Sequence, residues 1–290
     1  MKPTIDHIIL TRFNLPSKGV ESLARAQDGW LRSRQELFEK YCLPSIRQQT
    51  RKDFTWVIYF DPHSPQWLKE RIGQLGADRS FIPVFRDSVS PAELLHDLRA
   101  AGAGSRDVLL TTNLDNDDGL CLDFVQRVQD AVADAGPAAL YIGQGLIQRG
   151  HRLYLRQDPF NAFCSVAAPW SEPETCWMDW HNRLSEHLPV IGIGGKPGWL
   201  QVIHGSNVSN RVRGRRVGPG AYARDFAGGL HDAAAPRGWE SLGERFILRP
   251  ARVLKEVLRR SAKEAIIALG GRDLLGRAKE WAGKYSPARR

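Results

Sequence analysis

Three carboxylates stand close together near the middle of the chain, directly after a short apolar run. Residues 108–114 are mostly apolar, and Asp115, Asp117 and Asp118 follow them. Three acids within four positions repel one another, and the common remedies are a bound divalent cation or a solvated turn. Because Asn, Asp and Gly are also the commonest turn residues, the acids alone leave a solvated turn open as the alternative.

The elements before these acids predict where they lie. A short apolar run is typical of a buried strand, and an open α/β sheet places its ligand site at the carboxyl ends of its strands. Three strand and helix units precede the run, and their alternation predicts a parallel sheet with helices on both faces. The expected strands are 5–11, 54–61, 80–86 and 108–114, and the expected helices are 30–49, interrupted at Pro44, then 65–75 and 91–101.

The pattern changes after Asp118. We expect a helix at 122–135, then short strands that extend the same sheet in an antiparallel manner, a Trp-rich helix at 175–187 and a late strand at 199–204. The short strands are expected at 139–147, 151–156 and 161–166.

The composition fits one α/β domain with an appendage. The chain has 290 residues, and 42% of them are hydrophobic, which is ample for a packed core. We expect a domain of residues 1–217, a Gly-, Ala- and Pro-rich linker of residues 218–247 and a basic amphipathic helical tail of residues 248–290. No apolar run approaches the roughly 20 residues of a membrane span. The N-terminus has no apolar signal core, and the four cysteines are too scattered for a zinc site, so we expect a cytoplasmic protein.

Most of the net positive charge lies in the tail. Residues 249–290 carry 12 Lys/Arg and 4 Asp/Glu, which accounts for +8 of the formal net charge of +9. The rest of the chain is nearly neutral, so we expect no nucleic-acid partner. Two placements of the tail stay open. It packs on the domain with a solvated basic face, or it lies on the anionic inner face of a membrane.

Two further stretches resemble a known family. Residues 43–50 and 54–61 resemble the helix and second strand of nucleotide-diphospho-sugar glycosyltransferases of the GT-A fold. More narrowly, residues 114–119 together with 199–209 resemble the bacterial putative rhamnosyltransferase family, and the resemblance covers about residues 5–215. It implies a GT-A-like α/β fold with a mostly parallel central sheet and an antiparallel C-terminal half. No Gly-x-Gly-x-x-Gly follows the first strand, which counts against a dinucleotide-binding Rossmann domain.

The resemblance implies a site for Mn²⁺ or Mg²⁺ built on Asp117, Asp115 and His204. Glycosyl transfer leaves negative charge on the departing diphosphate, and a divalent cation offsets that charge as a Lewis acid. We expect Asp117 to be the first ligand and Asp115 to reach the ribose or a metal-bound water. Asp118 is expected to orient Asp117 or to face the sugar. For His204, a structural histidine is the alternative to a third ligand.

The same resemblance implies that Thr11, Arg12 and Asp61 frame the nucleotide. Arg211, with Arg213 close behind it, is expected to clamp the diphosphate, because the guanidinium fork matches phosphate oxygens. Solvated surface arginines are the alternative.

An inverting transfer also needs a base to take the proton of the acceptor hydroxyl. Asp179 is our first candidate because Trp177 and Trp180 flank it and could stack on sugar faces, and Glu174 is the second. The alternative is a surface acid on an amphipathic helix whose tryptophans lie in the core.

Together these features predict a metal-dependent glycosyltransferase that moves a sugar, rhamnose by the family's name, from a nucleotide-diphosphate donor to a saccharide or glycolipid acceptor. Two alternatives stay open. One is a phosphohydrolase or nucleotidyltransferase that uses the carboxylates in a two-metal mechanism. The other is a noncatalytic module that binds carbohydrate or membrane.

Overall fold

The computed structural model describes residues 3–16, 28–102, 106–132, 136–204 and 211–243, together with positions 246 and 250. The chain divides into two compact units, Met1–Ala235 and Pro236–Arg290. Both sheets belong to the first unit, and the short helix α7 (Gly238–Gly243) belongs to the second.

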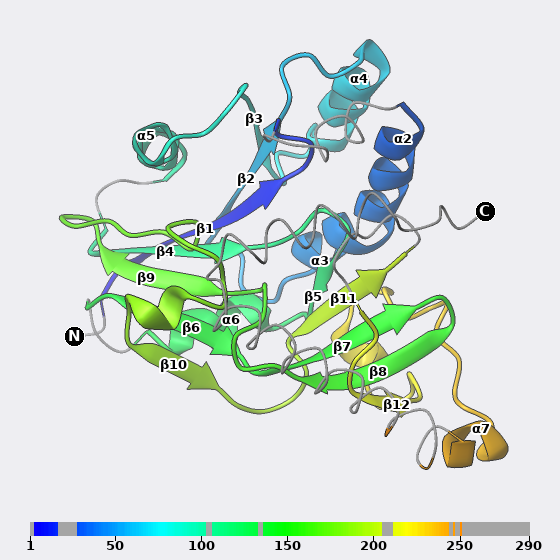
Figure 1. Ribbon diagram of the computed structural model, residues 1–290. Coiled ribbons are helices and arrows are strands. Elements are labelled where there is room, and N and C mark those ends of the chain that lie inside the picture. The colour runs from blue at the N-terminus through cyan, green and yellow to red at the C-terminus, as the bar shows by residue number, and fades with distance from the viewer. Residues whose placement is uncertain are drawn as a thin grey trace, which may run out of the picture. The chain divides into compact units, whose positions relative to one another are not determined.

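Four parallel strands form one side of the larger sheet of the first unit (Figure 1). β1 (Ile5–Arg12) lies between β2 (Thr55–Phe60) and β4 (Val108–Asn113), and β3 (Ile82–Phe85) pairs with β2 at the edge. The carboxyl ends of these strands meet at one edge of the sheet. The end of β4, where the acidic segment begins, therefore lies beside the end of β1.

Three later strands complete this sheet. β9 (Ser165–Pro169) pairs antiparallel with β4 and with β6 (Ala138–Ile142), and β10 (Val190–Ile193) runs parallel to β6. The resulting order is β10-β6-β9-β4-β1-β2-β3. The prediction of an α/β, GT-A-like fold with a mostly parallel central sheet is confirmed.

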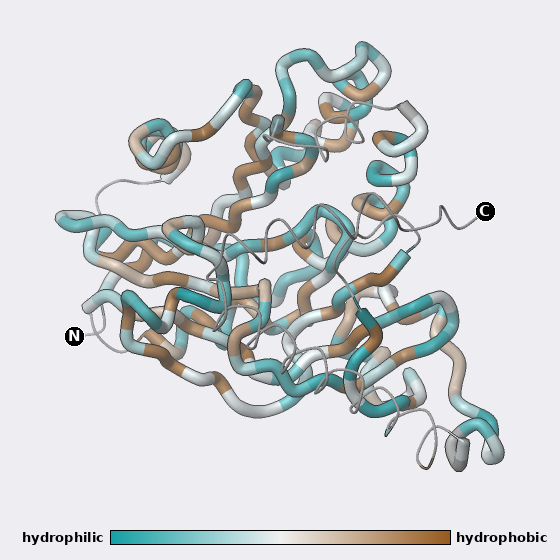
Figure 2. The backbone as a smooth tube through the Cα atoms, in the orientation of Figure 1, coloured by the Kyte–Doolittle hydropathy of each residue, from teal (hydrophilic) through white to brown (hydrophobic). Residues whose placement is uncertain are grey.

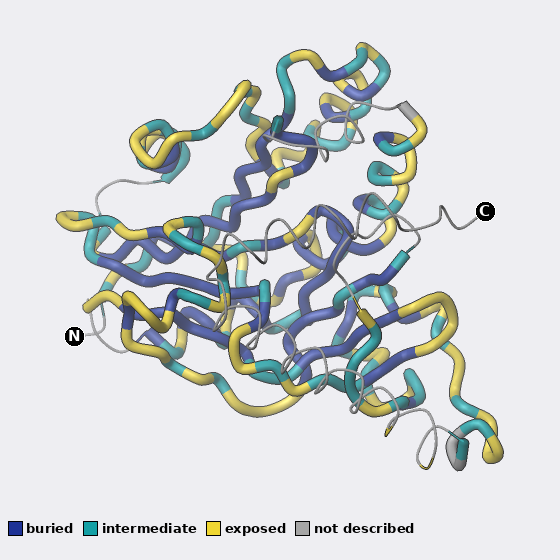
Figure 3. The backbone as a smooth tube through the Cα atoms, in the orientation of Figure 1, coloured by how far each residue is buried: buried dark blue, intermediate teal, exposed yellow. Residues whose placement is uncertain are grey.

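Helices cover both faces of this sheet because its central strands are apolar on both sides. On β1, Ile9 belongs to one buried cluster, and Ile8 and Leu10 belong to another. The helices α4 (Gln66–Leu75) and α6 (Phe124–Asp130) contribute to the Ile9 cluster, with η1 (Phe38–Cys42) and α3 (Leu43–Arg47). The helix α5 (Pro91–Ala101) contributes to the opposite cluster. Figures 2 and 3 show apolar, buried segments along the strands and hydrophilic, exposed segments between elements.

The first helical segment is divided as the sequence predicts. α2 (Asp28–Leu37) leads into a π-helical turn, η1 (Phe38–Cys42), and then into α3 (Leu43–Arg47). Pro44 lies in the first turn of α3, where a missing backbone N–H leaves no hydrogen bond unmade.

A second, five-stranded sheet replaces the expected simple extension of the first. Its strands, in the order β12-β8-β7-β11-β5, are β12 (Arg215–Val217), β8 (Arg152–Gln157), β7 (Gln144–Arg149), β11 (Trp199–Ile203) and β5 (Gly119–Leu120). The single strand that we expected at 139–147 is divided at Gly143, with β6 in the larger sheet and β7 in the smaller one. The chain has to bend to change sheets, and a glycine accommodates such a bend.

The predicted helix at 175–187 is wrong. Turns and one short 3₁₀ helix, η2 (Leu184–Glu186), occupy this segment. Local side-chain bonds compete with helix formation here, since the Asp179 carboxylate accepts a hydrogen bond from the N–H of Trp180 at 2.7 Å. The N–H of Cys176 is also engaged, by the hydroxyl of Thr111 at 2.8 Å.

The compact first unit extends to Ala235, further along the chain than the expected boundary at residue 217. Residues 218–235 include the 3₁₀ turn η3 (Ala223–Asp225), and the side chains of Phe226 and Leu230 are buried in the core. Most of the expected tail, from residue 251 onward, lies outside the described residues. Within the described ranges, no helix has both the length and the apolar character of a membrane span.

Candidate functional site

The acidic segment joins the two sheets. It begins at the end of β4 in the larger sheet and continues into β5, which pairs antiparallel with β11 in the smaller one. Asp118 is buried, and its Oδ1 accepts a hydrogen bond of 2.7 Å from the backbone N–H of Val202 in β11. Burial, and then the charges of Asp117 and Asp115, raise the pKa of Asp118 well above its usual range. Asp118 therefore ties the segment to the smaller sheet.

Asp117 is buried between His204 and Arg34. Its Oδ2 lies 2.8 Å from Nε2 of His204, which directly follows β11, and it also forms an ion pair with the guanidinium of Arg34 in α2. The guanidinium carbon of Arg34 lies 4.9 Å from the ring centroid of Trp30, one turn earlier in the helix. Burial opposes ionisation of Asp117. The hydrogen bond from His204 and the charge of Arg34 outweigh burial and lower the pKa of Asp117.

The pair of Asp117 and His204 has the donor chemistry of a cation site. The separation of 2.8 Å between their atoms is close to the roughly 3 Å between neighbouring ligands of an octahedral ion with bonds of about 2.1 Å. Within the described ranges, no three His, Cys, Asp or Glu side chains are grouped so that they could hold a metal ion. Mg²⁺ commonly takes only one or two protein ligands when substrate phosphates complete its shell. The two residues therefore fit a cation that is shared with a diphosphate.

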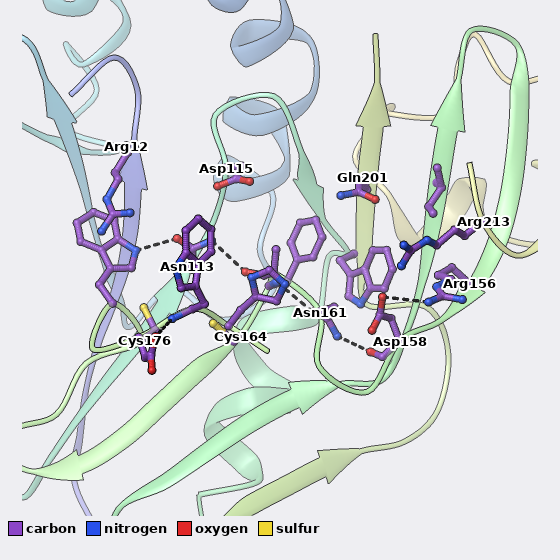
Figure 4. A pocket seen from close by; sticks show the side chains of 18 of the residues that line it. Arg12, Asn113, Asp115, Arg156, Asp158, Asn161, Cys164, Cys176, Gln201 and Arg213 are labelled. Atoms are coloured by element: carbon purple, nitrogen blue, oxygen red, sulfur yellow. Dashed lines mark hydrogen bonds and ion pairs between the residues drawn. The ribbon is translucent and has the colours of Figure 1, made fainter. Parts of the chain in front are cut away.

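A cavity of about 590 Å³ lies beside the acidic segment (Figure 4). The structure brings five of the predicted site residues together at it, which are Arg12, Asp115, Asp179, Arg211 and Arg213. The side chain of Asp115 is exposed to the cavity although protein atoms surround it densely. This environment, and then the charge of Asp117, raise the pKa of Asp115.

An aromatic and polar wall closes one end of the cavity. The guanidinium carbon of Arg12 lies 3.9 Å from the ring centroid of Trp177. The indole N–H of Trp177 donates to Oδ1 of Asn113 at 2.8 Å, and the Asn113 amide donates to the carbonyl of Ala162 at 2.9 Å. These bonds join the ends of β1 and β4 to the loops before and after β9, and they fix the Arg12 charge at the wall.

In addition to Asp117, Asp118 and His204, three predicted residues lie outside the lining of this cavity. Thr11 is fully buried, and its hydroxyl accepts a hydrogen bond of 2.9 Å from the indole N–H of Trp56. The carboxylate of Asp61 accepts a bond of 2.7 Å from the N–H of His63 in a turn. Glu174 is exposed and is not a lining residue. A nucleotide contact of Thr11 or Asp61, and a catalytic role for Glu174, stay predictions.

Asp179 lines the cavity with its carboxylate held by neighbours. Oδ2 lies 3.0 Å from Nε2 of His187 and 3.2 Å from the guanidinium of Arg183, and Oδ1 accepts from the N–H of Trp180. The hydrogen bond from His187, and then the one from Trp180, lower the pKa of Asp179. Asp179 is therefore ionised at neutral pH.

The sequence of residues 6–216 matches the family model described as putative rhamnosyl transferase. The chain belongs to this family. It is therefore a glycosyltransferase, and the predicted family and enzyme class are confirmed. Among curated proteins, no sequence matches this chain significantly.

Solved structures with a similar arrangement include residues 1–349 of TarS from S. aureus in complex with UDP-GlcNAc. That structure has 11% sequence identity and a TM-score of 0.45, and the match covers 73% of this chain and 62% of that one. A putative nucleotide-diphospho-sugar transferase from Desulfovibrio desulfuricans G20 has 10% identity and a TM-score of 0.37, with 78% and 93% coverage.

Sequence reasoning did not find several residues of this glycosyltransferase site. Arg34 was missed because it lies on a mostly exposed helix 83 positions before Asp117, and only tertiary packing brings the two together. Asn113 stood inside the predicted strand, where a polar residue at the strand end was the available signal. Arg156 and Asp158 carried no signal, because nothing in the sequence predicts that β8 borders the cavity.

Proposed function

We propose that this glycosyltransferase moves a sugar, rhamnose, from a nucleoside-diphosphate donor to a saccharide or glycolipid acceptor, with Mn²⁺ or Mg²⁺ bound at Asp117 and His204. The observation that carries this proposal is the contact of 2.8 Å between His204 and Asp117, which lies two residues after the cavity-lining Asp115. Membership of the family supports rhamnose as the sugar.

The residues of the chain divide the binding task. Asp117 and His204 would hold the cation, which when bound would offset the negative charge of the leaving diphosphate. Arg12 and Arg211 line the cavity and would bind diphosphate oxygens through charge-assisted hydrogen bonds. Asp115 would accept hydrogen bonds from hydroxyl groups of the ribose or the sugar.

Asp179 is the proposed base for an inverting transfer. It lines the cavity and is ionised at neutral pH, which is the state in which a base must start. A carboxylate oxygen of Asp179 would take the proton of the acceptor hydroxyl while the oxygen of that hydroxyl attacks the anomeric carbon. The bond from the anomeric carbon to the phosphate oxygen breaks, and the diphosphate leaves with the bonding electrons.

The donor set weighs against a two-metal phosphohydrolase or nucleotidyltransferase. Two-metal sites place two cations about 4 Å apart and need several shared carboxylates. The part of the chain that the structure describes contains no group of three His, Cys, Asp or Glu side chains suited to one cation.

A donor panel tests the proposal. Full-length protein is incubated with Mn²⁺ and UDP-, GDP- and dTDP-sugars, including dTDP-rhamnose, beside the plain nucleoside triphosphates, and released nucleotides are measured by mass. We expect release of a nucleoside diphosphate from a rhamnosyl donor. Turnover of the plain triphosphates with no release from any nucleotide-sugar would contradict the proposal and favour the hydrolase.

A further inference from the structure

The cavity has a second, arginine-rich end. Figure 4 shows Arg156, Arg213 and Asp158 on the side of the cavity away from Arg12. Arg156 belongs to β8 and Asp158 directly follows that strand, whereas Arg213 precedes β12, which pairs antiparallel with β8. This end is therefore built by the smaller sheet, while Arg12 and Asp115 come from the larger one.

Gly214 holds Arg213 close to the strand that carries Arg156. The backbone of Gly214 has φ +89°, and a Cβ atom there would lie 2.1 Å from the carbonyl oxygen of Leu155. Only a glycine permits both this conformation and this approach. The chain therefore brings two arginines to one place by a backbone contact that a larger residue would prevent.

Arg156 has spare hydrogen-bonding capacity. Its Nε is buried and has no hydrogen-bond partner among the described residues, and its Nη2 lies 3.4 Å from Oδ2 of Asp158. Buried donors are normally satisfied, and an unsatisfied one marks a place where a ligand or water belongs. The end is also positively charged, because Arg156 and Arg213 lie there with Asp158 as the neighbouring carboxylate.

An exposed aromatic ring lies on the same cavity. Trp180 is 71% exposed and is a lining residue. A large aromatic side chain left in water offers an apolar face on which a ligand ring can pack. Arginines can bind an anionic group, and an indole can pack against a sugar ring. The two together would suit a sugar that bears an acidic group.

We infer that this end binds an acidic saccharide acceptor, with Arg156 and Arg213 on its carboxylate or phosphate group and Trp180 against its ring. The inference rests on the proposed function, because it assigns the acceptor of that same transfer. It places the acceptor anion on the smaller sheet and leaves Arg12, Asp115 and Asp117 to the donor. The competing assignment is that Arg156 and Arg213 bind the donor diphosphate.

Binding of matched sugars tests the inference. The probes are methyl glucuronide, methyl galacturonide and methyl glucoside 6-phosphate, each beside its neutral methyl hexoside, and affinities are measured by NMR titration in the presence of the released nucleotide. We expect at least one acidic probe to bind about tenfold more tightly than its neutral partner. The carboxylate and phosphate probes show which acid the site takes.

Substitutions test whether Arg156 and Arg213 cause the preference for acidic probes. In Arg156→Gln/Arg213→Gln the acidic preference should fall from about tenfold to about twofold or less, because both charge-assisted donors are removed. In Arg213→Gln alone it should fall to an intermediate value. Arg152→Gln, an exposed change on the same strand, should keep it. Donor KM, measured as hydrolysis of the nucleotide-sugar, should stay within about twofold in all three.

Equal affinity for acidic and neutral probes in the wild type would overturn the inference. So would a preference that survives the double substitution, or a tenfold increase in donor KM, which would assign these arginines to the diphosphate. Failure of the proposed function would give a different result. No nucleotide-sugar would then be turned over, whatever the affinity for acidic probes.

Discussion

Nε2 of His204 lies 2.8 Å from Oδ2 of Asp117, although the two residues are 87 positions apart in the chain. His204 follows a strand of the smaller sheet, and Asp117 follows a strand of the larger one. One carboxylate and one imidazole, each following a strand of a different sheet, are thus brought into contact.

This contact predicts that His204→Ala removes metal-dependent activity without unfolding the protein, since the ion pair of Arg34 with Asp117 remains. We expect donor turnover with Mn²⁺ to fall at least 100-fold and the thermal shift on adding Mn²⁺ to disappear. Asp117→Asn should have the same effect on activity and should also destabilise the protein by about 3 kcal/mol, because Arg34 loses its buried partner. Asp78→Asn, at an exposed pair with Arg47, is the control. Full activity of either test variant would contradict the assignment.

Asp179→Asn should lower kcat by about 10²–10⁴-fold, because the amide cannot take the acceptor proton. Donor KM should change little, since Asp179 is assigned to the acceptor hydroxyl. Glu174→Gln is the matched comparison, because Glu174 is exposed and outside the cavity. Steady-state transfer assays with one fixed acceptor measure both. A loss confined to Glu174→Gln would exchange the two roles.

Asp118 allows a comparison of two substitutions at one position. Asp118→Asn retains an oxygen that accepts from the N–H of Val202 and removes a charge that burial disfavours, so unfolding free energy should change by less than about 1 kcal/mol. Asp118→Ala leaves that N–H unsatisfied and should cost about 1–3 kcal/mol. Urea denaturation measures both variants. Equal stabilities of the two would show that the bond to Val202 contributes nothing.

Gly145→Ala should destabilise the protein by about 2 kcal/mol through overpacking. A Cβ atom at Gly145 would lie 2.0 Å from the indole ring of Trp199, which stacks on Phe163 with 5.0 Å between ring centroids and lines the cavity. Gly73→Ala is the control, because a Cβ there meets no atom within 4 Å and alanine stabilises a helix by about 0.5–1 kcal/mol. Thermal unfolding should shift in opposite directions, and a gain in both variants would refute the predicted clash.

His7 predicts loss of stability in acid. It is buried between the hydroxyl of Thr112 at 2.8 Å and the amide of Gln129 at 3.2 Å, and burial lowers its pKa from 6.5 to about 3. Below pH 6.5 His7 binds a proton in the unfolded chain but stays neutral in the folded protein until the pH nears 3. The stabilisation is therefore complete above pH 6.5 and is lost progressively as the pH falls toward 3.

The expected loss is about 2 kcal/mol of unfolding free energy between pH 7.5 and pH 5, measured by urea denaturation. His7→Gln removes the titrating group, and its stability should fall less over the same range. If wild type and variant decline in parallel, His7 does not carry the effect.

The four parallel strands β1 to β4 could be predicted from sequence because they are short runs rich in apolar residues, separated by helices with clear end signals. The helix α5 is an example, since Ser90 and Glu93 have the spacing of a capping box, which marks the start of a helix in the sequence. The ligand edge followed from Asp115 standing directly after such a run. Local pattern and tertiary structure agree throughout this part of the chain.

The second sheet could not be predicted, because its pairings depend on distant partners. The sequence predicts residues 139–147 as one strand, whereas the pairing of β6 with β10 and of β7 with β8 divides this stretch between two sheets. The ion pair between Arg34 and Asp117 has the same origin. Helical periodicity describes one face of α2 and contains no information about which strand end that face will meet.

The acidic segment has a mechanical consequence. Five residues, 114–118, span the gap between β4 and β5, and Asp118 fastens their far end to Val202. Because this connection is only five residues long, movement of one sheet relative to the other would require a change in the backbone conformation of residues 114–118. A change in the alignment of the two sheets would therefore change the distance between Asp117 and His204.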